Sequence, residues 1–217
     1  SSWTEVSDLN TARHDLGGAG ISTAALAFGG LAHPKAITES WDGTSWTEVA
    51  DLGTARYDGG SGGIQTSAMF FGGQETATSG KTEAWDGSSW TEVADLATVR
   101  FSVAGTGSNN TALFAAGGNP GTVTTVEEWD KTSTLAAGAW ATGGNLNTAK
   151  FGMGTGGTQT AAIAAGGSSP PYTDTVETYD GSSWTEVADI NTTRGECGSA
   201  GTQTAALIFG GTTGSNT

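Results

Sequence analysis

The chain has 217 residues, of which 22 are acidic and 8 basic, so its formal net charge is −14. This charge disfavours binding to nucleic acid or to anionic membrane surfaces, and no apolar run approaches the length of a membrane-spanning segment. Glycine is frequent, at 36 residues, but it recurs at regular positions, which argues against a low-complexity disordered chain.

One segment recurs along the chain with a period of about 44 residues. Its copies are SSWTEVSDLNTAR at 1–13, SWDGTSWTEVADLGTAR at 40–56, AWDGSSWTEVADLATVR at 84–100, a divergent copy at 128–150, and TYDGSSWTEVADINTTR at 178–194. We therefore interpret 1–217 as a single domain with repeat units at approximately 1–13, 14–56, 57–100, 101–150, 151–194 and 195–217, the last one partial.

The second complete period shows the expected elements of one repeat. A glycine-rich stretch, YDGGSGG, follows Arg56 and predicts a first strand that approaches other backbones closely. The run TSAMFFGG at 66–73 is too short for a globular helix and predicts a buried second strand. A polar loop, QETATSG, precedes a third strand, KTEAW, and the run SWTEVADL gives a fourth. We name these strands a, b, c and d.

The dipeptide Asp86-Gly87 separates strands c and d and is typical of a tight hairpin turn. Trp85 and Trp90 should then face each other across the hairpin, and the same arrangement is expected for Trp41 with Trp46 and Tyr179 with Trp184. In the divergent copy the corresponding residues, Trp129 and Trp140, are eleven positions apart rather than five, which predicts a bulkier c–d loop.

The order of a basic residue, two strands, a Gly-Gly pair, a Glu-x-aromatic element and a tryptophan resembles the kelch repeat of β-propellers. The repeat positions are Gly29, Gly30, Gly72, Gly73, Gly117, Gly118, Gly166, Gly167, Gly210 and Gly211, together with Trp3, Trp46, Trp90, Trp140 and Trp184. The resemblance implies an all-β, kelch-like propeller with four-stranded antiparallel blades, five repeats of which lie in this chain. The wording WDGSSWTEVAD is also similar to kelch-like repeats of predicted virion proteins of marine bacteriophages.

The two ends supply a strand d at the start and strands a and b at the end. In a closed ring the N-terminal SSWTEV would close or extend the last blade as its strand d. The missing strand c leaves three interpretations: the sequence is a window on a longer protein, which we favour, or TTGSNT at 212–217 acts as a minimal strand c, or another chain donates one. Five blades are then a minimum.

The sequence offers few candidates for chemistry. His14 and His33 have no second ligand at metal-binding spacing, and two histidines with one cysteine cannot build the copper centre of oxidases that share the kelch architecture. We therefore expect no metal and no other cofactor. The carboxylates recur in every repeat, whereas a glycan lyase or hydrolase needs one distinct pair. We expect no enzyme, and we expect glutamates of strand c such as Glu83 to pair with Arg56 or Arg100.

The periodic tryptophans fit packing between blades better than stacking on sugars. The b–c loops do differ between repeats, and variable loops on a repeated scaffold often carry recognition, although drift in surface loops explains the variation equally well. Strand alternation places these loops on the same rim as the d–a connections. Our candidate binding residues are His33, Pro34, Lys35, Asn119, Pro120, Pro171 and Tyr172.

Taken together, these patterns and the resemblance predict a non-enzymatic structural or recognition module of a virus particle, as a bacteriophage fibre, spike or decoration protein located in the virion. The expected partners are other virion proteins or a host-surface glycan or protein, bound through several copies of the module. The alternative is a bacterial surface or secreted adhesin domain that binds glycan or protein outside the cell. Neither hypothesis involves nucleic-acid binding or insertion into a membrane.

Overall fold

A computed structural model of the chain describes residues 4–33, 35–131 and 138–213. These residues form eighteen strands in five antiparallel sheets and no helix, which confirms the predicted all-β class. Four sheets have four strands in sequence order, as predicted for propeller blades, and the fifth has two. No helix in this part of the chain could span a membrane.

The strands follow the predicted a, b, c, d order in each repeat. Blade 1 contains β1 (Gly17–Ile21), β2 (Ala24–Phe28), β3 (Thr38–Trp41) and β4 (Trp46–Val49). Blade 2 contains β5 (Gly60–Ile64), β6 (Ser67–Phe71), β7 (Thr82–Trp85) and β8 (Trp90–Val93). Blade 3 contains β9 (Ala104–Asn109), β10 (Ala112–Ala116), β11 (Val126–Asp130) and β12 (Ala139–Thr142). Blade 4 contains β13 (Gly154–Thr158), β14 (Ala161–Ala165), β15 (Val176–Tyr179) and β16 (Trp184–Val187), and the two-stranded blade 5 contains β17 (Gly198–Thr202) and β18 (Ala205–Phe209).

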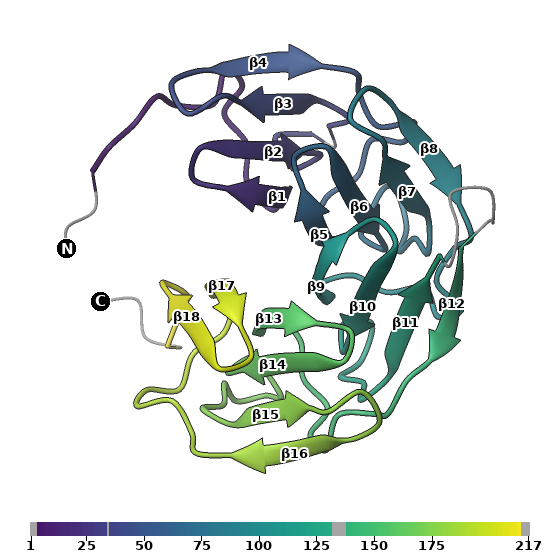
Figure 1. Cartoon of the computed structure of the whole chain (residues 1–217). Helices are drawn as coiled ribbons and strands as arrows, with labels where there is room; N and C mark the ends of the chain where they lie inside the picture. Colours follow the sequence, from purple (N-terminus) through teal and green to yellow (C-terminus); the bar gives the residue numbers. More distant parts are fainter. Residues whose placement is uncertain (1–3, 34, 132–137, 214–217) are drawn as a thin grey trace.

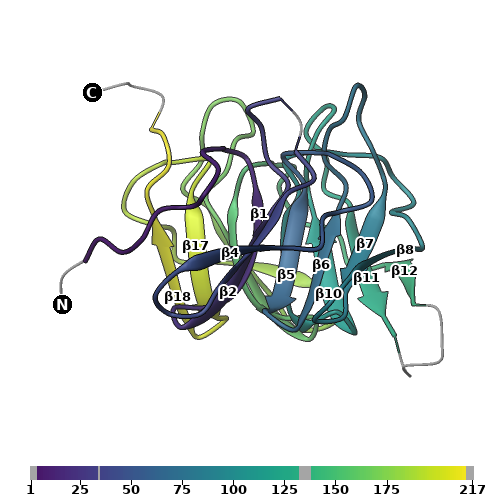
Figure 2. The same ribbon diagram turned by 90° about the horizontal axis from the view of Figure 1, so that it is seen from above.

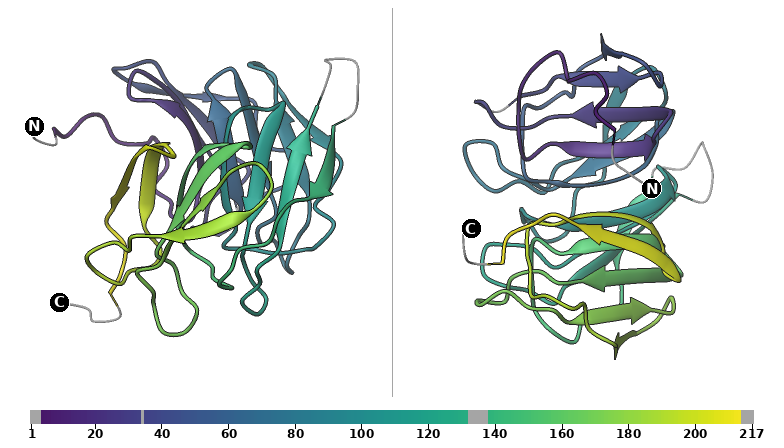
Figure 3. Two further views of the ribbon diagram at one scale, coloured as in Figure 1. Left: turned by 60° about the horizontal axis from the view of Figure 1, so that its bottom comes forward. Right: turned by 90° about the vertical axis from the view of Figure 1, so that its left-hand side faces the viewer.

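The blades are arranged around a common axis, with strand a of each blade innermost and strand d outermost (Figure 1). The strands β1, β5, β9, β13 and β17 lie next to one another in that order around the axis. Blade 1 and blade 5 stand at the two ends of this arc, and both chain ends lie on the same side (Figure 3). The described part of the chain is thus an open arc rather than a closed ring.

Glycine in strand a allows the inner strands to approach one another. A Cβ atom placed on Gly105 would lie 2.4 Å from the ring of Phe71 and 2.9 Å from the backbone oxygen of Ser61 on the neighbouring blade. Any side chain there would displace backbone as well as an aromatic ring, because protein interiors hold little free space. The second strand supplies the apolar filling, and Met69, Phe70 and Phe71 of β6 are fully buried.

The Gly-Gly pair after each strand b is explained by backbone conformation. In all five copies both glycines have positive φ, between 62° and 67° at the first position and between 81° and 111° at the second. A residue with a Cβ atom rarely adopts these angles. The pair therefore turns the chain sharply out of the buried strand b into the b–c loop.

The tryptophans pack in the interior, as predicted. Trp85 lies opposite Trp90 in the register of β7 and β8, with ring centroids 5.4 Å apart, and the equivalent pairs in blades 1, 3 and 4 lie at 5.3, 5.6 and 5.0 Å. The strand d tryptophan also reaches the preceding blade, since Trp90 contacts Phe28 edge to face at 4.8 Å. These contacts make the aromatic residues part of the seams between blades; Trp3 lies outside the described residues.

The strand c glutamates form the predicted ion pairs, three of which join two blades while the fourth joins the N-terminal segment to blade 1. Glu83 of β7 lies 3.1 Å from Arg56, which belongs to the connection that leaves blade 1. The equivalent pairs are Arg13 with Glu39, Arg100 with Glu127 at 3.0 Å, and Lys150 with Glu177 at 3.1 Å. The pairs are buried, so removal of one partner would leave an uncompensated charge in the interior.

The c–d turn is longer than the Asp-Gly dipeptide suggested. The backbone N–H of Asp86 donates to the carbonyl of Ser89 at 3.2 Å, and the carboxylate of Asp86 accepts the N–H groups of Ser88 and Ser89. The hairpin is thus a four-residue loop in which the aspartate organises the turn and Gly87 supplies the positive φ of 100°. The longer c–d loop predicted in the divergent copy falls mostly on residues 132–137, outside the described residues.

The prediction of an N-terminal outer strand is wrong for the described residues. Residues 4–9 form no strand and instead pack on blade 1, where Ser7 Oγ donates to the carbonyl of Thr44 at 2.9 Å and Trp46 Nε1 donates to the carbonyl of Ser7 at 3.2 Å. A strand d pairs with a strand c, and β18 has no third strand beside it in the described chain. Of TTGSNT, residues 212 and 213 form no strand and the remainder lies outside the described residues.

Candidate functional site

The b–c loops and the d–a connections share one rim, as predicted. Residues that follow the basic position pair with the start of the b–c loop in every repeat, for example Tyr57 with Gln74 and Phe101 with Asn119. The a–b and c–d turns occupy the opposite rim, where Trp41 Nε1 donates to the carbonyl of Ser22 at 3.0 Å. We call the first of these the loop rim; it lies along the upper side of the molecule in Figure 2.

In blade 1 the b–c loop presents His33, which is exposed and has a φ of 86°. The N–H of Lys35 donates to the carbonyl of Gly30 at 2.9 Å, and the carbonyl of Lys35 accepts the N–H of Arg56 at 3.2 Å. The backbone of this loop is therefore fixed to the seam between blades while His33 faces solvent. Pro34 lies outside the described residues.

The other candidates come from blades 3 and 4. Asn119 pairs through its backbone with Phe101, and the exposed Pro120 follows it through a cis peptide bond. Pro171 is also exposed and follows a cis bond, whereas the half-buried ring of Tyr172 packs over Gly195, where an added Cβ would come within 2.5 Å. The structure places the candidates on one rim but in loops of three separate blades, and it gives Tyr172 a packing role.

A second feature of the loop rim surrounds the axis and was not found from the sequence. One residue per repeat, two positions after the basic residue, adopts a left-handed conformation with φ between 49° and 59°: Asp15, Asp58, Ser102, Gly152 and Glu196. The backbone N–H of each of the last four donates to the carbonyl of the equivalent residue in the preceding repeat, at 2.8, 2.8, 3.4 and 2.8 Å. We call these five residues the axial arc.

The axial arc is acidic. Asp58 and Glu196 line a cavity of about 280 Å³ with Asp15 and Ser102. Burial, together with the carboxylates of Asp15 and Glu196, raises the pKa of Asp58 to about 6, although Ser102 Oγ donates to its carboxylate at 2.8 Å. Burial and Asp15 also raise the pKa of Glu196. This end of the axis therefore gains protons as the pH falls from neutral to mildly acidic and repels anions above that range.

Below the axial arc, the inner strands line a cavity of about 310 Å³ along the axis. The side chains that line the cavity belong to alanine, serine and threonine, and the rest of the lining is glycine backbone. The hydroxyl groups link neighbouring blades: Ser61 Oγ accepts the N–H of Gly18 at 3.2 Å and donates to its carbonyl at 3.1 Å, and Ser199 does the same to Thr155. The hydroxyls of the axis thus hold the blades together.

The axial arc has a sequence signal that is visible only when the repeats are aligned on the basic residue. The aligned position holds aspartate twice, then serine, glycine and glutamate. Aspartate and glycine are residue types that tolerate a left-handed conformation. In a single repeat, Asp58 stands in an unremarkable polar stretch, so its place on the axis depends on the tertiary arrangement.

The same architecture occurs in a solved structure described as the structure of YjhT, with a TM-score of 0.77. The chain has a β-propeller fold. The alignment covers 98% of this chain and 81% of that chain at 14% sequence identity, so the likeness concerns the arrangement of the blades. No protein-family model matches the propeller sequence, and no curated protein matches it either.

Proposed function

We propose that this propeller is a non-enzymatic recognition module, that its loop rim contacts the partner, and that it belongs to a virus particle. The observation that carries the recognition role is the division between constant and variable parts. Strands, Gly-Gly pairs, tryptophans and inter-blade ion pairs repeat from blade to blade, whereas the b–c loops, all on one rim, differ in sequence and conformation. Such loops on a rigid scaffold are the usual place of recognition.

The carboxylates of strand c support a structural role for the most regular acidic position. Glu127 receives the N–H groups of Ala97 and Thr98 at 2.7 and 3.4 Å as well as the guanidinium of Arg100 at 3.0 Å. A carboxylate that is buried and bound by three donors is fixed in place, with its oxygens already occupied by protein groups. The proposal of a non-enzymatic module rests on this structural role of the acidic residue that recurs in each repeat.

The virion setting rests on the resemblance of the WDGSSWTEVAD segments to kelch-like repeats of bacteriophage proteins. Density-gradient fractionation of native source material, with peptides of this protein followed by mass spectrometry, tests it. Co-migration with DNA-filled particles is the expected result. Recovery only with cell envelopes or with free protein would overturn the virion setting and favour the surface adhesin.

The loop rim is tested separately with isolated cell envelopes as the probe. We expect a double variant, His33→Ala with Lys35→Ala, to lower the retention of the purified propeller on envelopes at least fivefold. The matched control is Lys131→Ala, which removes one positive charge next to a c–d loop on the opposite rim and should leave retention unchanged. Equal loss in both variants, or loss in neither, would contradict binding through the loop rim.

A further inference from the structure

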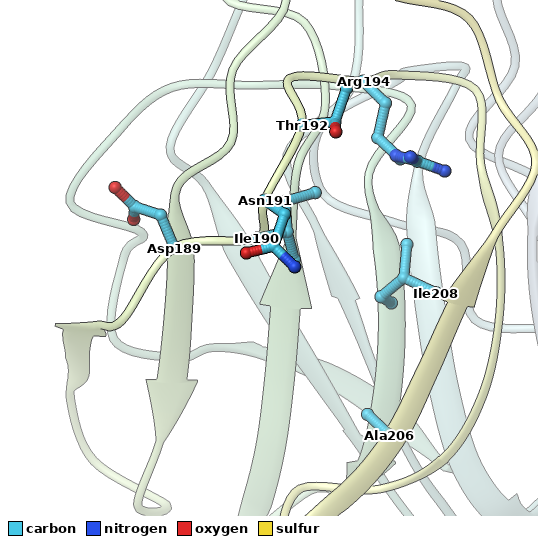
Figure 4. A pocket seen from close by; sticks show the side chains of 7 residues that line it. All are labelled: Asp189, Ile190, Asn191, Thr192, Arg194, Ala206 and Ile208. Carbon is cyan, nitrogen blue, oxygen red and sulfur yellow. The ribbon is translucent and has the colours of Figure 1, made fainter.

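A pocket of about 320 Å³ lies between blade 4 and β18. Figure 4 shows its lining: Asp189, Ile190, Asn191, Thr192 and Arg194 come from the connection that leaves blade 4, and Ala206 and Ile208 come from β18. The Arg194 guanidinium extends toward β18, and its Nη1 donates to the carbonyl of Gly210 at 2.9 Å. Both sides of the pocket belong to elements that recur in every repeat.

In the three preceding seams, and between the N-terminal segment and blade 1, the corresponding space is filled by the glutamate of strand c. Glu177 accepts the N–H groups of Asn147 and Thr148, at 2.7 and 3.4 Å, and lies 3.1 Å from Lys150. Asn191, Thr192 and Arg194 occupy the equivalent positions of the next repeat. The pocket therefore contains, at the equivalent positions, the two backbone N–H groups and the cation that surround Glu39, Glu127 and Glu177.

The residues along β18 also correspond to those that pair with a strand c glutamate in the complete blades. In blade 2, Phe70 stands opposite Glu83 and Ala68 opposite Trp85. The equivalent residues of β18 are Ile208 and Ala206, both of which line the pocket. A strand added antiparallel to β18 in this register would place a glutamate beside Ile208, facing Arg194, and an aromatic residue beside Ala206.

Exposure marks the site as uncovered in the described chain. Arg56 and Lys150 are 0% exposed in their seams, whereas Arg194 is only partly buried. On the other face of β18, Leu207 is 53% exposed, while its equivalent in β6, Met69, is 0% exposed. An exposed sheet edge with apolar side chains is a template for pairing with a further strand.

Asn191 extends the match to a fourth strand. Its equivalents Asn10 and Asn147 each donate from Nδ2 to the carbonyl of the strand d tryptophan of the following blade, Trp46 and Trp184, at 2.9 Å. The side chain of Asn191 is therefore placed to bind a Trp carbonyl in the same way. The site is suited to a hairpin in which Glu-x-aromatic is followed by a turn and a tryptophan.

We propose that β18 and this pocket form an acceptor site for a β-hairpin of the type Thr/Val-Glu-x-Trp/Tyr, a turn and Trp, supplied by polypeptide outside residues 1–217. The sequence of this chain contains four Glu-x-aromatic elements, and each is already a buried strand c of its own blade. The donor is therefore a segment outside these elements that carries this acidic and aromatic pattern. Main-chain hydrogen bonds to the sheet edge would give affinity, and the ion pair with Arg194 would set the register.

The test uses the intact protein and a fluorescein-labelled peptide with the sequence of residues 81–93, KTEAWDGSSWTEV. Fluorescence anisotropy should show saturable binding to the wild-type protein. A Glu83→Gln peptide should bind about tenfold more weakly, because it loses the charge that faces Arg194. On an Arg194→Gln protein the two peptides should differ by less than about twofold, since the interaction is then already lost.

Arg194→Lys is the matched variant, because Lys150 holds Glu177 in the equivalent seam. It should retain the preference for the glutamate peptide, whereas Lys131→Gln, which removes a charge next to the c–d loop of blade 3, should bind as the wild type does. Hydrogen exchange should slow at residues 205–209 when peptide is bound. The proposal is overturned if wild-type protein shows no saturable binding, if the two peptides bind equally, or if Arg194→Gln leaves the preference intact.

Discussion

The indole of Trp184 lacks a hydrogen-bond acceptor that its counterparts have. Trp90 Nε1 donates to Thr38 Oγ1 of the preceding blade at 3.0 Å, and Trp140 Nε1 donates in the same way at 3.2 Å. The equivalent position in blade 3 is Val126, and Nε1 of the buried Trp184 has no partner among the described residues. We predict that Val126→Thr supplies the acceptor and stabilises the protein.

The expected size follows from two opposing terms. A buried donor without a partner costs about 1–3 kcal/mol, and exchanging a fully buried methyl group for a hydroxyl loses about 1 kcal/mol of apolar burial. A gain of about 1 kcal/mol in the free energy of unfolding remains, or about 2–4 °C in Tm for a protein of this length. Urea denaturation and calorimetry measure these quantities.

The reverse change at the equivalent position is the control. Thr38→Val removes the acceptor from Trp90 and should lower the free energy of unfolding by about 1 kcal/mol. The indole N–H resonance of Trp184 should also shift in the Val126→Thr variant. If Val126→Thr is destabilising while Thr38→Val is neutral, the reasoning from the unpartnered indole is refuted.

Three further changes test other parts of the fold. Asp58→Asn should raise the free energy of unfolding by about 1–2 kcal/mol at pH 7.5, because a pKa near 6, against an ordinary value of 3.8, means that ionised Asp58 destabilises the folded state. Urea titrations should show this gain in stability shrinking between pH 6 and pH 4, and a gain that does not depend on pH contradicts the assignment. Glu83→Gln should lower the free energy of unfolding by about 3 kcal/mol, because Arg56 stays buried without its counter-ion. A loss below about 1 kcal/mol in denaturant unfolding would contradict a stabilising role for this ion pair. Gly105→Ala should cost about 2 kcal/mol or more in the same assay, whereas Gly18→Ala, whose Cβ would have 3.7 Å to its nearest neighbour, should be almost neutral; similar effects of both would be unexpected.

The strands of a blade could be predicted from the sequence because the same residue types recur at the same positions in each repeat. Five aligned runs that end in Gly-Gly identified the buried strand b, and the spacing of Trp85 and Trp90 identified their cross-strand contact. The pairing of Glu83 with Arg56 also followed from repetition, since a charge pattern kept in each period predicts a structural role. Contacts between residues that recur in four repeats can therefore be predicted from the sequence alone.

The remaining features depend on tertiary arrangement. Burial raises the pKa of Asp58 most, the carboxylates of Asp15 in the preceding repeat and Glu196 across the axis raise it further, and no single period contains these groups. The expected N-terminal strand failed for a related reason, because a strand d needs a paired strand c and the segment found hydrogen bonds on blade 1 instead. The b–c loops gave binding candidates by variation alone, and variation does not show that Tyr172 packs on Gly195.

The inter-blade ion pairs couple each blade to the next one along the chain. In each seam between blades 1 and 4, the buried cation belongs to the connection leaving one blade and is neutralised by a glutamate of the next, as Arg100 is by Glu127 and Lys150 by Glu177. In a linear chain of nearest-neighbour couplings, a unit at the end lacks one coupling and opens most easily. Amide exchange should therefore be fastest in β17 and β18 and slowest in blades 2 and 3. Unfolding would then spread from Arg194 backward through the chain, one seam at a time.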